Sequence, residues 1–97
     1  SFAQSQVFEW RVVRELRADF FWRDPYAHEV YIVLVKDIFV PVEVKFGQID
    51  DKGVVVFLKK NKLKNGIIIS SAIEEERRYA DSRIKIVPAY LYFLSQR

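Results

Sequence analysis

Residues 39–46 read FVPVEVKF, and this stretch says most about the fold. Its β-branched and aromatic residues favour a strand. Pro41 has no N–H to donate, so it belongs at the start of the strand, at an edge or at a bulge. Side chains two apart on a strand share a face, so we expect Glu43 and Lys45 to project together, with valines behind them. The stretch therefore predicts a half-buried strand that carries a carboxylate beside an ammonium group.

The segments on either side of this strand alternate between helical and extended patterns. Apolar residues recur at helical spacing in some, and β-branched runs bounded by turn signals form the others. We expect helices over residues 4–17, from 50 or 51 to 62 and over 88–96. We expect strands over residues 19–23, 29–36, 39–46, 66–71 and 84–87. Residues 74–82 are compatible with either a helix or a loop. The order is α-β-β-β-α-β-β-α, and the middle helix makes a right-handed crossover to a parallel strand. The sequence thus predicts an α/β fold, a mixed β-sheet with helices on both faces.

The length of the loop before residues 39–46 decides which side chains face Glu43. A three-residue loop over 36–38 places Glu43 opposite Tyr31 and Lys45 opposite Glu29 on one patch. A two-residue loop breaks this grouping. Both alternatives are compatible with the sequence.

The Glu43-Val44-Lys45 tripeptide is the best-placed chemical feature of the chain. A carboxylate suits Mg²⁺, which orients a water and stabilises charge on a phosphoryl group. A neighbouring lysine can position that water or neutralise the phosphoryl oxygens. The alternative is an exposed charge pair on a half-buried strand, because so short a motif often arises by chance.

Composition limits the classes of protein. The chain has 97 residues, about half of them apolar, so it can form one domain with its own core. It has no cysteine, which excludes disulfides and thiol chemistry, and it lacks an apolar run of membrane-spanning length and a secretory signal. We expect a soluble, cytoplasmic protein without a membrane partner. Abundant Val, Ile, Lys and Glu without Cys or Met resembles the composition of thermophile proteins.

Candidate ligand-binding residues lie outside the tripeptide too. The net charge is +3, and a lysine cluster suits phosphate contacts, although a solvated helix end is the commoner explanation of such a cluster. The aromatic segment over 20–26 suits base stacking or core packing. His28 is the single histidine, and such a loop residue is most often solvated. No Gly-rich phosphate loop is present. The lysines are Lys59, Lys60, Lys62 and Lys64.

Five stretches in order along the chain carry a family resemblance: VFEWRVVREL, FFWRDPYAHEVYIVL, PVEVKFG, GIIISS and IVPAYLYFL. Together they resemble the nuclease-like C-terminal domain of archaeal and bacterial P-loop ATPases, which has the PD-(D/E)XK, or restriction-endonuclease-like, core also seen in archaeal Holliday-junction resolvases. By this resemblance Glu9 matches a glutamate of the first helix, and Glu43 and Lys45 match the Glu-x-Lys motif. It also implies that residues 1–97 are a single domain of a longer protein with an ATPase domain in the same polypeptide.

One residue departs from the family pattern. Tyr31 stands where the family has a metal-binding aspartate, and a phenol is a poor Mg²⁺ ligand at neutral pH. The resemblance thus predicts an impaired nuclease-like domain that binds DNA or a partner. The alternatives are an active Mg²⁺-dependent endonuclease, with Lys45 and Glu43 catalytic and Glu43, Glu9 or Glu29 on the metal, and a protein-interaction domain that binds no nucleic acid.

Overall fold

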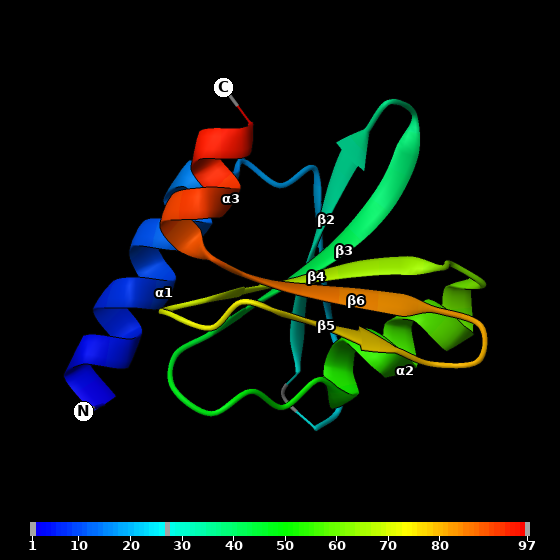
Figure 1. The fold of residues 1–97 in the computed structure, drawn as a ribbon, viewed down its shortest axis with the longest axis horizontal. Helices are drawn as coiled ribbons and strands as arrows, with labels where there is room; N and C mark the ends of the chain where they lie inside the picture. Colours follow the sequence, from blue (N-terminus) through cyan, green and yellow to red (C-terminus); the bar gives the residue numbers. More distant parts are fainter. Residues whose placement is uncertain (1, 27, 97) are drawn as a thin grey trace.

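A mixed six-stranded sheet divides the molecule, and helices cover both of its faces (Figure 1). The computed structural model describes residues 2–26 and 28–96. The predicted α/β fold with helices on both faces is confirmed. The elements are α1 (Phe2–Leu16), β1 (Phe20–Arg23), β2 (Glu29–Val35), β3 (Ile38–Lys45), α2 (Lys52–Asn61), β4 (Asn65–Ser70), β5 (Glu75–Arg78), β6 (Arg83–Pro88) and α3 (Ala89–Ser95).

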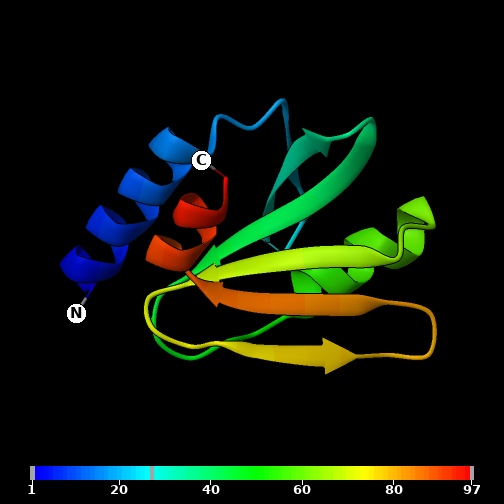
Figure 2. The same cartoon turned by 45° about the horizontal axis from the view of Figure 1, so that its top comes forward.

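The strands lie in the order β1-β2-β3-β4-β6-β5 (Figure 2). The first three form an antiparallel meander, whereas β3, β4 and β6 run parallel to one another. Helix α2 connects β3 to β4, as expected for a crossover between parallel strands. The predicted parallel fourth strand is therefore confirmed.

Two hydrophobic clusters, one on each face of the sheet, make up the core. On one face α1 and α3 cover the sheet, with Val12, Val42 and Tyr92 among the buried residues. On the other face α2 packs Val54 and Leu58 against isoleucines of β4 and β6. Alternate residues of β3 therefore point toward different helices, and this decides which side chains can meet.

Strand β5 corrects the prediction for residues 74–82. These residues were expected to form a helix or a loop, but Glu75–Arg78 pair antiparallel with β6, so the order is α-β-β-β-α-β-β-β-α. The segment EERR has no apolar alternation because it is a short edge strand and is mostly exposed. Charged residues on an edge also discourage pairing with another chain.

The hairpin between β2 and β3 has a two-residue loop. Val35 pairs with Ile38, and the loop residues Lys36 and Asp37 have φ of 49° and 67°. Two consecutive positive φ angles are typical of a type I′ turn, whose twist suits a hairpin. Of the two loop lengths compatible with the sequence, the structure has the one that breaks the grouping of Tyr31 with Glu43.

Candidate functional site

Glu43 and Lys45 lie on the α2 face of β3 and form an ion pair. Glu43 Oε2 is 3.3 Å from Lys45 Nζ. The Glu43 side chain is 2% exposed, whereas that of Lys45 is 26% exposed. The predicted sharing of one face is confirmed, but the carboxylate is enclosed and the lysine covers it.

The first turn of α2 encloses the other carboxylate oxygen. A β-carbon at Gly53 would lie 2.5 Å from Glu43 Oε1, so only glycine fits without a shift. Among the described residues, Oε1 has no hydrogen-bond partner. Burial raises the pKa of Glu43, and the Lys45 charge and the nearby Val54 backbone N–H oppose that rise. The first turn of α2 thus closes off the Oε1 side of the carboxylate.

His28 and Asp24 form a hydrogen-bonded pair next to Glu43. The distance from His28 Nδ1 to Asp24 Oδ2 is 2.7 Å, and Asp24 Oδ1 accepts the backbone N–H groups of Tyr26 and His28, each at 2.9 Å. Burial raises the pKa of Asp24, but the hydrogen bonds with His28 and Tyr26 outweigh it and leave that pKa low. The expectation of a solvated histidine is therefore wrong. The turn signal that begins at Asp24, four residues before His28, could have pointed to this pair, because Asp side chains in turns bond nearby backbone groups.

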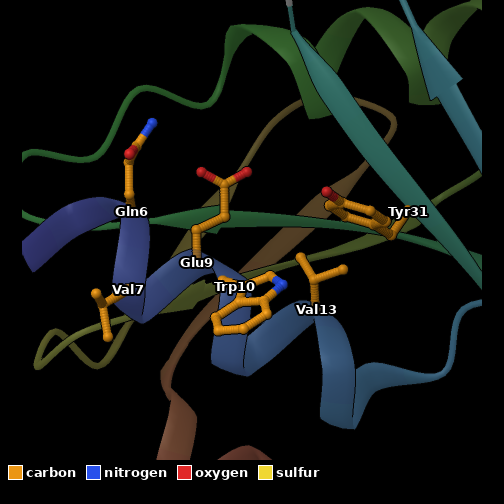
Figure 3. A pocket seen from close by; sticks show the side chains of 6 residues that line it. All are labelled: Gln6, Val7, Glu9, Trp10, Val13 and Tyr31. Atoms are coloured by element: carbon orange, nitrogen blue, oxygen red, sulfur yellow. The ribbon is translucent and has the colours of Figure 1, made fainter. Parts of the chain in front are cut away.

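Tyr31, Glu9 and Glu29 lie on the opposite face of the sheet. Tyr31 pairs with Val42, which packs under α1 and α3. Figure 3 shows Glu9 of α1 and Tyr31 of β2 at a cavity of ≈ 460 Å³. Burial raises the pKa of Tyr31 to about 12, with Glu29 and Glu9 adding to the rise. Burial also raises the pKa of Glu9, and Glu29 adds to that rise while Lys45 opposes it.

The three carboxylates proposed as metal ligands are thus divided between the two faces. Glu9 and Glu29 lie on the α1 face, and Glu43 lies beneath α2. In the described part of the chain, no group of three His, Cys, Asp or Glu residues is arranged to hold a metal ion. The convergence of these residues around one Mg²⁺, which the active-endonuclease alternative requires, is not found among the described residues.

The lysines proposed to contact phosphate are exposed at the C-terminal end of α2. Lys59 and Lys60 lie in the last turn, and Lys62 ends the helix in the left-handed conformation with φ of 55°. Within residues 2–26 and 28–96, none of these lysines makes an ion pair. We call Lys59, Lys60, Lys62 and Lys64 the lysine patch.

Comparisons with protein-family models, with curated proteins and with solved structures find no match for this chain. No helix in the described ranges is both long enough and apolar enough to cross a membrane.

Proposed function

We propose that this chain is a nuclease-like module that binds nucleic acid without cleaving it, as an accessory to an ATPase domain in the same polypeptide. The resemblance of five stretches in order along the chain supports the restriction-endonuclease-like fold. The α-β-β-β-α-β order and the Glu43-x-Lys45 motif on a central strand agree with it.

The enclosed state of Glu43 supports the absence of cleavage. A carboxylate that binds Mg²⁺ must offer an oxygen to the ion and usually leaves room for several waters. Here Lys45 lies 3.3 Å from Oε2, and Gly53 lies against Oε1. A buried carboxylate paired with a lysine is a structural element of the core in this proposal, inherited from a motif that serves catalysis in active relatives of the fold.

The lysine patch supports nucleic-acid binding. Exposed lysines that have no ion-pair partner among the described residues are available to phosphates, and each neutralised phosphate releases counterions. Their position at a helix C-terminus also suits the helix dipole, which stabilises positive charge there. We therefore expect binding that depends on salt and is insensitive to sequence.

Fluorescence anisotropy with a labelled DNA duplex tests this proposal. Lys59→Gln with Lys62→Gln removes two patch charges, and Lys52→Gln with Lys85→Gln removes two exposed charges elsewhere. The patch variant should flatten the slope of log affinity against log salt by about 2, since B-DNA contributes about 0.9 per phosphate contact. The control variant should leave the slope unchanged. Equal effects of both variants, or no binding by wild type, would overturn the proposal.

A second candidate function, docking of the ATPase domain, is favoured by the uncovered end of the β2–β3 hairpin. Phe20 is 57% exposed, Leu34 and its cross-strand partner Phe39 are each 45% exposed, and the Phe20 and Phe39 rings are 5.7 Å apart. These side chains lie on one face of β1, β2 and β3, and exposed apolar side chains gathered in this way mark an interaction surface. Under this function, Leu34→Ser with Phe39→Ser abolishes binding of the ATPase domain and leaves DNA binding intact; unchanged domain binding would exclude it.

A further inference from the structure

Two adjoining cavities lie along the junction between α1 and α3. Figures 1 and 2 both show these helices side by side. The cavities measure ≈ 370 Å³ and ≈ 780 Å³, and both are lined by Arg11, Glu15 and Phe93. Because they share these three lining residues, they lie next to each other, and we call the two together the α1–α3 groove. It is lined by none of the residues of the lysine patch.

One end of the α1–α3 groove is basic. Arg11, Arg14 and Arg17 line it, and none of them makes an ion pair within the described part of the chain. The Arg14 guanidinium lies 5.4 Å from the centroid of the Trp10 ring, a cation–π contact that orients the side chain. Glu15 is the one acidic residue that lines this end, so the lining carries a net positive charge.

The other end of the groove is aromatic and apolar. Phe93 lines both cavities, and Tyr90 lines the smaller one. The Tyr90 side chain is 69% exposed, although its helix is short and packs against the sheet. An exposed ring held on a fixed helix offers a flat surface for another planar group.

We propose that the α1–α3 groove binds single-stranded nucleic acid. The arginines hold the phosphate backbone, and Tyr90 and Phe93 stack against bases. Grooves that combine positive charge with aromatic rings bind single strands in this way. A duplex keeps its bases stacked on one another inside the helix, so they cannot stack on Tyr90 and Phe93. This inference rests on the proposed nucleic-acid function. It adds a second site, which binds single strands, to the lysine patch, which binds duplex DNA. The arginines favour a phosphate backbone over an apolar protein helix as the occupant.

The experiment titrates fluorescein-labelled oligothymidylate of about 15 nucleotides, within the site sizes of such proteins, and a duplex of equal length. Tyr90→Leu removes the ring, and Tyr90→Phe is its matched control. Arg11→Gln with Arg14→Gln tests the basic end, and Lys59→Gln with Lys62→Gln tests the lysine patch. All of these side chains are exposed, so equal thermal unfolding of the variants is expected and is checked first.

Tyr90→Leu should weaken oligothymidylate binding about tenfold and leave duplex binding unchanged, since one stacked base is lost. Tyr90→Phe should bind as wild type does. The arginine variant should flatten the salt slope for the single strand by about 1.4, because each of the two phosphate contacts contributes about 0.7. If the groove variants bind oligothymidylate normally while the patch variant weakens the duplex, the groove assignment is overturned and the proposed function stands. If wild type binds neither DNA, both are overturned.

Discussion

The α-carbon of Gly53 faces Glu43 so closely that a β-carbon there would lie 2.5 Å from Oε1 of the carboxyl group. This approach brings the start of α2 onto the middle of β3. It buries the acidic residue of the Glu-x-Lys motif and leaves Lys45 as its charged neighbour. The same contact limits which substitutions the site tolerates.

Gly53→Ala should destabilise the protein by about 1–3 kcal/mol through overpacking. In most helix interiors the same substitution stabilises by about 0.5–1 kcal/mol. The sign of the change in unfolding free energy therefore shows whether Gly53 is packed against Glu43. Urea unfolding measures the difference. In a Glu43→Ala background the cost should shrink but not vanish, because His28 Cβ would still lie 2.9 Å from the added carbon. A stabilised Gly53→Ala protein would mean that α2 does not lie against Glu43.

Lys45→Met should make stability depend on pH. The Lys45 charge opposes the rise in the pKa of Glu43, so its loss raises that pKa further. A carboxyl group whose pKa is raised by folding stabilises the protein below its unfolded pKa, and this contribution disappears as pH rises through the folded pKa.

The Lys45→Met variant should therefore lose about 3 kcal/mol relative to wild type at pH 8, and less at pH 4.5. Urea unfolding at the two pH values measures both losses. Lys52→Met, at an exposed position, is the control and should show no such trend. A loss that is the same at both pH values would exclude a buried, ionised Glu43 in the variant.

Asp37→Gly should stabilise the β2–β3 hairpin. Asp37 has φ of 67°, a conformation that glycine adopts without strain, and type I′ turns favour glycine at this position. We expect a gain of about 0.5–1 kcal/mol in urea unfolding, less the entropy that glycine adds to the unfolded chain. Asp37→Val should lose stability instead. A gain with valine would contradict the two-residue loop.

Local alternation made much of β3 predictable, because a strand's two faces follow from its sequence. Glu43 and Lys45 share a face as expected. The β2 residues that lie beside Glu43 and Lys45 were not predictable, because the pairing of β2 with β3 depends on whether the hairpin loop holds two residues or three. The two loop residues, Lys36 and Asp37, include neither Asn nor Gly, so they carry no clear signal for a type I′ turn. A change of one residue in the register moves Tyr31 to the other face.

The features that sequence reasoning missed depend on tertiary contacts. Strand β5 is charged and exposed, so its pairing with β6 leaves no apolar pattern to read. His28 lies beside Glu43 because the turn at Asp24 directs it inward, and that contact joins elements distant in sequence. The close approach of Gly53 is likewise visible only once α2 is placed on the sheet.

Cleavage of labelled single-stranded, duplex and branched DNA with Mg²⁺ or Mn²⁺ shows whether Glu43 serves a working metal site. Wild type, Glu43→Gln and Tyr31→Asp are compared under the same conditions. We expect that all three bind DNA and none cuts it, because position 31 faces α1 and a carboxylate there cannot join Glu43 on one ion. Cleavage by wild type that Glu43→Gln abolishes, or cleavage gained by Tyr31→Asp, would show that Glu43 can bind a catalytic metal ion.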